Sequence, residues 1–243
     1  IRDRTRPDDI RLLKAAAESE RFRGMLVCNY VNQIELETQT QFSALCYILE
    51  DGRRFVAFRG TDTTLVGWKE DFNMAFICPV PAQLSAVKYL ERIAAGTDGA
   101  LMLGGHSKGG NLAVYSAAKS IGEIQERIVA IHNNDGPGFA KPLVGTPEHT
   151  RVADRILTVV PQSSVVGQLL EHEQNVEIVR SDAEGMLQHD GFSWEVKGTQ
   201  FVHLDDFSRE GKLVDETIDK WADSLNTQQR EALAEALYSV FTA

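Results

Sequence analysis

The chain has 243 residues, of which 43% are hydrophobic and 25% charged, and it carries a net charge of −10. This composition is enough for a substantial buried core, and it excludes a disordered or collagen-like chain. An acidic chain without clustered Lys and Arg also argues against a nucleic-acid partner, because such partners require neutralisation of their phosphates. No window approaches about 18 uninterrupted apolar residues, so we expect no transmembrane helix.

The acidic residues are concentrated toward the end of the chain. From Glu171 onward there are 16 acidic and 6 basic residues, whereas residues 1–170 contain 19 of each. Solvated helix faces are the plainest interpretation, and a surface that steers cationic partners is the alternative.

Three cysteines (Cys28, Cys46 and Cys78) lack the spacing of a disulfide framework or a metal site. Their apolar neighbours predict buried, reduced thiols, and hence a cytoplasmic protein. The chain begins at Ile1 rather than Met, which leaves open a leader removed from a longer protein.

Residues 1–24 contain seven basic residues and a helical pattern around residues 10–20. They predict an N-terminal arm that packs on this chain or on a neighbour. A β-hairpin follows, in which two apolar runs at 42–49 and 54–58 flank the turn signal Asp51-Gly52.

Apolar residues at helical spacing then predict a helix over 83–95, after a break at Pro79 and Pro81. Beyond it, short apolar runs alternate with helical patterns. We expect buried strands at 100–104, 127–132, 155–160 and 176–180, and helices at 111–120 and 212–241. This alternation predicts an α/β fold with a mostly parallel central sheet flanked by helices, and a single domain over residues 1–243.

One short motif carries chemistry. Gly105-His106-Ser107-Lys108-Gly109 fits G-x-S-x-G, in which a serine occupies a sharp turn from a strand to a helix. The flanking glycines let the strand and the helix approach closely, and the helix N-terminus directs partial positive charge at the serine. A predicted strand ends at this motif and a predicted helix begins after it, which is the context that a nucleophilic serine requires.

Residues 103–113, Leu-Gly-Gly-His-Ser-Lys-Gly-Gly-Asn-Leu-Ala, resemble the nucleophile elbow of the fungal-type (class 3) lipases. They resemble more closely a little-characterised bacterial family of lipase-like hydrolases. A second matching segment is Val-Ala-Phe-Arg-Gly-Thr at 56–61, with Trp68 and Asp71 downstream. The resemblance implies an α/β-hydrolase fold and a serine hydrolase that cleaves lipid or other acyl esters.

The resemblance also implies roles for particular residues. Ser107 is the nucleophile, and the backbone N–H groups of Thr61 and Lys108 stabilise the oxyanion, with the Thr61 hydroxyl as a further donor. The chemistry needs no cofactor and no metal. The expected partner is a small-molecule acyl ester, and a homodimer is one assembly that the sequence allows.

Ser107 needs a histidine base, which in this fold follows the acid in the chain. Of six histidines, His189 and His203 both follow the last predicted strand. We favour His189, in the loop 185–190, because that loop can fold back over the serine and Trp194 can wall the pocket. His203 is the alternative.

The triad acid departs from the class 3 pattern. Its aspartate would follow the strand at 155–160, yet the chain reads Pro161-Gln162-Ser163-Ser164-Val165 there. A neutral serine cannot replace an ionised carboxylate. Asp135 follows the strand after the elbow helix and is the favoured acid. Asp182 is the alternative, and a structural Asx turn at Asp135 is the competing interpretation.

The missing acid motivates a rival function. The protein could be a catalytically impaired hydrolase-fold protein that binds an acyl or peptide ligand. Thioesterase or acyltransferase activity would use the same residues as ester hydrolysis, so the sequence does not separate these reactions. Peptidase activity on the same triad is a second rival, but nothing in the sequence indicates a peptide-binding edge.

Overall fold

The computed structural model describes residues 6–35, 37, 40–61, 74, 78–139, 143–169, 176–213 and 229. Its centre is an eight-stranded sheet, whose order is β1-β2-β3-β4-β5-β6-β7-β10. Five neighbouring strands from β3 to β7 run parallel, while β1 and β2 at one edge and β10 at the other pair antiparallel. The predicted α/β fold with a mostly parallel central sheet is therefore confirmed.

The strands of this sheet are β1 (Leu26–Glu35), β2 (Thr40–Ile48), β3 (Arg54–Phe58), β4 (Leu101–His106), β5 (Ile128–Asn134), β6 (Ile156–Pro161), β7 (Val176–Val179) and β10 (His203–Leu204). A separate hairpin is formed by β8 (Val196–Lys197) and β9 (Gln200–Phe201).

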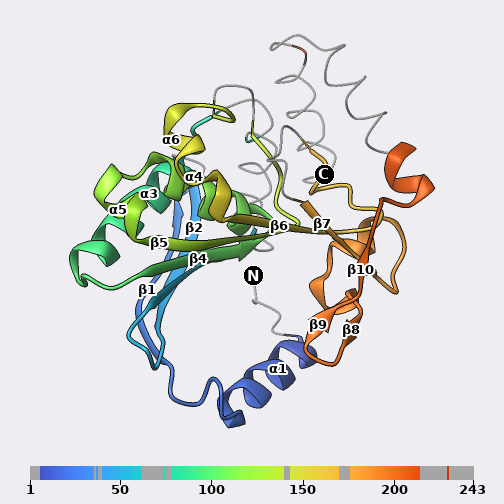
Figure 1. Cartoon of the computed structure of the whole chain (residues 1–243), viewed down its shortest axis with the longest axis horizontal. Helices are drawn as coiled ribbons and strands as arrows, with labels where there is room; N and C mark the ends of the chain where they lie inside the picture. Colours follow the sequence, from blue (N-terminus) through green and yellow to red (C-terminus); the bar gives the residue numbers. More distant parts are fainter. Residues whose placement is uncertain are drawn as a thin grey trace.

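The α-helices are α1 (Pro7–Glu18), α3 (Pro81–Ala95), α4 (Lys108–Lys119), α5 (Gly122–Arg127) and α6 (Pro147–Thr150). Short 3₁₀ turns are η1 (Ala153–Arg155), η2 (Gly185–His189) and η3 (Gly191–Ser193). Figure 1 shows α3 to α6 gathered on one side of the sheet, with α1 and the β8–β9 hairpin on the other.

Helix α4 lies at the centre of the packing. Every residue from Lys108 to Ala118 is buried, because the helix is enclosed by the sheet on one side and by α3 on the other. Its glycines and alanines permit this close approach. Helix α3 instead buries one stripe at helical spacing, which includes Ala86, Leu90 and Ile93.

The expected hairpin at 42–58 is present as β2 and β3, with Ala44 opposite Phe58. The helix at 83–95 and the four expected strands also appear, with boundaries shifted by one or two residues in most of them. In β7, however, only Val179 is buried. The helix expected at 111–120 begins earlier, at Lys108, directly after the serine. The N-terminal helix is present as α1, none of whose residues is buried.

Strand β1 was not predicted. Its sequence lacks the alternation of apolar and polar residues that marks a half-buried strand. In the structure its ten residues are exposed or half-buried. Trp68, Asp71 and nearly all of the helix expected at 212–241 lie outside the described residues.

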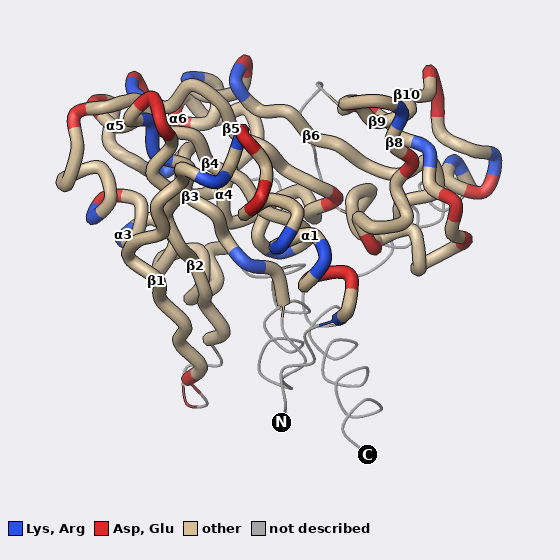
Figure 2. The backbone as a smooth tube through the Cα atoms, turned by 90° about the horizontal axis from the view of Figure 1, so that it is seen from below, with Lys and Arg blue, Asp and Glu red and all other residues tan. Residues whose placement is uncertain are grey.

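Charged residues are scattered along the described backbone, and Lys and Arg do not gather into one stripe on it (Figure 2). No helix among the described residues combines the length and the apolar composition of a membrane span.

Candidate active site

Ser107 occupies the turn between β4 and α4. Its backbone has φ 57° and ψ −132°, a conformation that residues with a side chain rarely adopt. The turn is held at both ends: the Ser107 N–H donates to the Asn134 carbonyl at 2.9 Å, and the Ser107 carbonyl accepts from the Gly110 N–H at 2.9 Å. The predicted strand–serine–helix elbow is therefore present, and the serine is only half-buried.

The glycines on either side of Ser107 are required by close backbone contacts. A Cβ atom on Gly105 would overlap the backbone of Gly109. A Cβ atom on Gly109 would overlap the Phe58 carbonyl at the end of β3. The G-x-S-x-G spacing thus allows β4, α4 and the end of β3 to meet at one point.

The segment Arg59-Gly60-Thr61 runs beside this elbow. A Cβ atom on Gly60 would lie 2.8 Å from the His106 carbonyl oxygen and 3.5 Å from Ser107 Cβ. Thr61 therefore follows a residue that touches the serine turn. Lys108 begins α4, where backbone N–H groups are not used by the helix itself. The two residues expected to stabilise an oxyanion thus come from two segments that meet at the serine turn.

The side chain of Lys108 is buried and points away into the protein. Its ammonium group donates to both the main-chain carbonyl and the side-chain oxygen of Gln41, at 3.1 and 2.6 Å. This links the start of α4 to β2.

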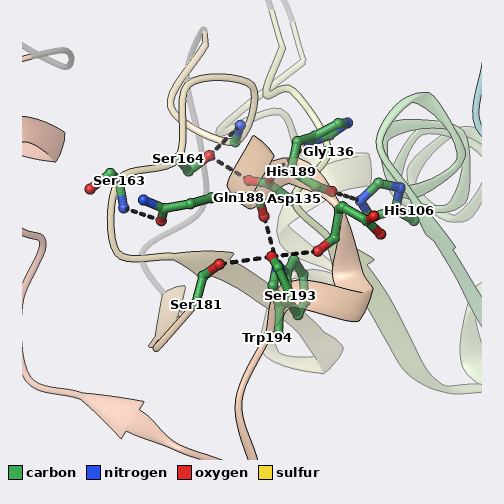
Figure 3. A network of polar contacts seen from close by, with 12 residues as sticks. His106, Asp135, Gly136, Ser163, Ser164, Ser181, Gln188, His189, Ser193 and Trp194 are labelled. Atoms are coloured by element: carbon green, nitrogen blue, oxygen red, sulfur yellow. Dashed lines mark hydrogen bonds and ion pairs between the residues drawn. The ribbon is translucent and has the colours of Figure 1, made fainter. Parts of the chain in front are cut away.

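Asp135 and His189 form a direct hydrogen bond. Nδ1 of His189 is 2.7 Å from Oδ2 of Asp135, and the carboxylate is 1% exposed while the imidazole is 26% exposed (Figure 3). Asp135 follows β5 with φ 48°, and its N–H donates to the Val159 carbonyl. The turn in this run is instead closed by Asn133, whose side-chain oxygen accepts from the Gly136 N–H at 3.1 Å. The Asp135 side chain is left to contact His189.

Because an ionised carboxylate only accepts hydrogen bonds, Nδ1 of His189 carries the hydrogen. In the neutral imidazole the other ring nitrogen, Nε2, then carries no hydrogen and can accept a proton. This is the tautomer that a general base needs.

His106 holds the His189 backbone in place. Its Nε2 lies 2.7 Å from the His189 carbonyl oxygen, and the two imidazole rings are 4.5 Å apart between centroids. Since a carbonyl oxygen only accepts, Nε2 of His106 is the donor. Burial is the main cause that lowers the pKa of His106, which favours the neutral ring at pH 7.

The rest of the loop that carries His189 is anchored on two sides. Gln188 accepts from the Ser163 N–H at 3.1 Å with its side chain, and its carbonyl accepts from the Trp194 indole at 2.8 Å. The Asp190 carboxylate accepts hydrogen bonds from the two terminal guanidinium nitrogens of Arg6, Nη1 and Nη2, at 2.6 and 3.1 Å. This pairing lowers the pKa of the Asp190 carboxyl.

The alternative residues lie elsewhere. His203 is on β10, with Nδ1 3.4 Å from Glu177, and its side chain is 48% exposed. Asp182 is exposed, and its N–H donates to the Ser193 carbonyl. His132 faces the Phe55 ring, and His149 is buried on α6. His172 lies outside the described residues.

Two residues at this site were not assigned roles from the sequence. The first is His106, whose contact with the His189 carbonyl joins residues 83 positions apart. The second is Ser164, whose hydroxyl contacts Oδ1 of Asp135. Only the position of Ser164 in the loop where an acid was expected could have drawn attention to it. In the part of the chain that the structure describes, no group of three or more His, Cys, Asp or Glu could hold a metal ion.

Comparison with known proteins identifies the family. The model of the Mbeg1-like family matches residues 16–239, and no curated protein matches the chain. Among solved structures, the chain is similar to an MDLA variant from Penicillium cyclopium, with a TM-score of 0.49 and 12% identity over 78% of this chain and 74% of that one.

It is also similar to a triacylglycerol lipase from Penicillium expansum, with a TM-score of 0.43 and 14% identity over 74% and 84% of the two chains. The M37 lipase gives a TM-score of 0.43 and 13% identity over 65% of this chain, which spans 62% of that lipase. The family match covers almost the whole chain, so this chain belongs to the Mbeg1-like family.

Proposed function

We propose that this protein is a serine hydrolase that cleaves carboxylic esters, of lipids or other acyl compounds, through an acyl-enzyme on Ser107. The observation that carries the proposal is the 2.7 Å hydrogen bond between His189 and the buried Asp135, at the edge of the sheet where the strained Ser107 turn lies. A catalytic serine requires such a base, oriented by a buried acid.

In this mechanism Nε2 of His189 takes the proton of the Ser107 hydroxyl as its oxygen attacks the acyl carbonyl. Asp135 keeps the Nδ1 hydrogen in place and stabilises the imidazolium that forms. The imidazolium then protonates the leaving alcohol, which releases the first product and leaves an ester on Ser107. Water, deprotonated by His189, hydrolyses that ester.

Negative charge develops on the carbonyl oxygen in each step. The backbone N–H groups of Thr61 and Lys108 are the proposed donors, because Gly60 touches the serine turn and Lys108 begins α4. Each such donor typically contributes about 3 kcal/mol to lowering the barrier. No cofactor takes part in the proposed reaction.

The alternative function is that of an impaired hydrolase that only binds a ligand. It was considered because no carboxylate follows β6. The contact of Asp135 with His189 supplies an acid from β5 instead, which favours the catalytic function. Thioesterase and acyltransferase reactions use the same groups, so the choice among acyl substrates belongs to experiment.

A panel of p-nitrophenyl esters of graded chain length tests the proposal. We expect wild type to hydrolyse at least one ester, Ser107→Ala to fall to background, and His189→Ala to lose about 10⁴-fold or more in kcat. His203→Ala is the matched control and should retain wild-type rates. Loss of activity in His203→Ala with retention in His189→Ala would overturn the assignment of the base. A wild-type protein inactive on every ester would overturn the function.

A further inference from the structure

Ser164 lies three residues after β6 and is 2% exposed. Its hydroxyl makes two contacts: one with Oδ1 of Asp135 and one with the Gly167 N–H, at 2.8 Å from the backbone nitrogen. The Gly167 N–H can only donate, so the Ser164 oxygen accepts there. The one hydrogen of the hydroxyl is then available for the carboxylate.

Both oxygens of Asp135 are therefore occupied by donors from different parts of the chain. Ser164 donates to Oδ1 and His189 donates to Oδ2. A buried carboxylate stays ionised only when hydrogen bonds replace its lost hydration. With one donor on each oxygen, rotation of the carboxylate away from His189 would break both bonds.

The loop around Ser164 closes tightly on the acid. A Cβ atom on Gly167 would overlap Oδ1 of Asp135, and it would come within 2.9 Å of the Ser164 hydroxyl and 2.7 Å of Val160. The space beside Oδ1 thus admits the serine hydroxyl and a glycine, and no larger group. The loop after β6, in which the sequence offers no carboxylate, contributes a hydrogen-bond donor to the carboxylate that β5 supplies.

We propose that Ser164 is a positioning residue for the triad, which holds the Asp135 carboxylate turned toward His189. This inference rests on the proposed function of Ser107, His189 and Asp135. Ser164 touches neither substrate nor Ser107 in this account and acts only through Asp135.

Ser163 provides a matched control. It is the preceding residue, it is also buried, and it carries the same hydroxyl. That hydroxyl bonds to the Ser208 hydroxyl at 2.6 Å instead of to the acid. Ser163→Ala therefore removes a partly buried hydrogen bond of a serine hydroxyl at a neighbouring site, without changing the donors to Asp135.

The activity test compares Ser164→Ala and Ser163→Ala by the dependence of kcat/KM on pH, with thermal unfolding as a check on folding. We expect Ser164→Ala to lower kcat about tenfold with KM little changed, as for the loss of a hydrogen bond to a charged group. Its acidic limb, which reports protonation of the base, should move to higher pH, because a carboxylate that has lost a donor stabilises the imidazolium more strongly. Ser163→Ala should match wild type. Equal losses in both variants, or an unshifted limb in Ser164→Ala, would overturn the proposal.

A double-mutant comparison shows whether Ser164 acts through Asp135. The second substitution should have less than about a twofold effect in an Asp135→Asn background, since the ionised acid is already gone. The same tenfold loss in both backgrounds would contradict the inference.

A spectroscopic readout separates this inference from the proposed function. The low-field proton NMR signal of His189 Nδ1–H, identified by its absence in His189→Ala, should shift or vanish in Ser164→Ala and remain in Ser163→Ala. An unchanged signal in Ser164→Ala would overturn the positioning role. Wild type that hydrolyses no ester would instead overturn the proposed function, while the NMR comparison would still decide whether Ser164 holds the acid in place.

Discussion

Asp135 and His189 are 54 residues apart in the chain, yet Nδ1 of His189 lies 2.7 Å from Oδ2 of Asp135. The contact joins the residue that follows β5 to the last residue of the 3₁₀ turn η2. It places a nearly inaccessible carboxylate beneath a partly accessible imidazole, so that the imidazole is the group able to meet a substrate.

The first prediction concerns the acid. Asp135→Asn preserves the shape of the side chain but no longer offers a carboxylate to the Nδ1 hydrogen. We expect kcat/KM for ester hydrolysis to fall about 10³- to 10⁴-fold, as in serine hydrolases that lose the acid. Steady-state kinetics at pH 7.5 measure this. Asp182→Asn is the control, and its rate should be that of wild type because Asp182 is exposed and takes no part in the proposed triad. The reverse ranking would assign the acid to Asp182.

The second prediction concerns the arm that contains α1. Arg6 binds Asp190, the neighbour of His189, through an exposed ion pair whose side chains are 52% and 38% accessible. Such pairs are worth about 1 kcal/mol or less, so Arg6→Ala should lower kcat/KM by no more than about fivefold. Added salt should bring wild type down to the level of the variant, because salt screens exposed charges.

Arg11→Ala serves as the control for the arm. Arg11 pairs with Asp8 inside the same helix, so its loss should not change kcat/KM. A loss larger than tenfold in Arg6→Ala that persists at high salt would show that the arm contributes more than this ion pair.

The third prediction concerns the elbow glycines. A methyl group on Gly109 would collide with the Phe58 carbonyl, whereas one on Gly122 meets nothing within 4 Å. Gly109→Ala should destabilise the protein by about 1–3 kcal/mol or more through overpacking. Gly122→Ala should be neutral, or stabilising by about 0.4–1 kcal/mol. Urea unfolding of both variants measures the difference. Equal free energies of unfolding would show that the backbone contact at Gly109 does not exclude a side chain there.

The fourth prediction concerns pH and stability. Burial lowers the pKa of His132 and is also the main cause of the lowered pKa of His106. The unfolded chain, whose histidines titrate near pH 6.5, therefore binds more protons than the native state below that pH. The free energy of unfolding should decrease as the pH falls from about 7 to 5.

Substitution of both histidines by glutamine tests this source of pH dependence. Each single variant should flatten the decrease between about pH 7 and 5, and the double variant should flatten it further. A slope identical to that of wild type in the double variant would assign the pH dependence to other groups.

The parts of the fold that follow from local patterns could be predicted from the sequence. The apolar runs of β4, β5 and β6 and the turn at Asp51-Gly52 are local signals. The glycine-flanked Ser107 is another. Strand β1 could not be predicted because its apolar residues do not alternate with polar ones, and only Cys28 and Val31 are half-buried against the core.

The site divides in the same way. Asp135 could be selected because it follows a buried strand, and parallel strands bring their carboxyl ends to one edge of the sheet. The contacts of His106 with His189, of Ser164 with Asp135 and of Arg6 with Asp190 span 83, 29 and 184 residues. These pairings depend on how the loops fold over the edge of the sheet. Hydrophobic periodicity predicts helices and strands but not the conformation of such loops.

The most direct test of the central claim is the intact mass of the protein after treatment with a fluorophosphonate, which reacts with activated serines. We expect one adduct on wild type, none on Ser107→Ala, and strongly slowed labelling of Asp135→Asn. This result would mean that Ser107 is a nucleophile activated through His189 and Asp135. No adduct on wild type, even in mild detergent, or an adduct that persists in Ser107→Ala, would contradict the account.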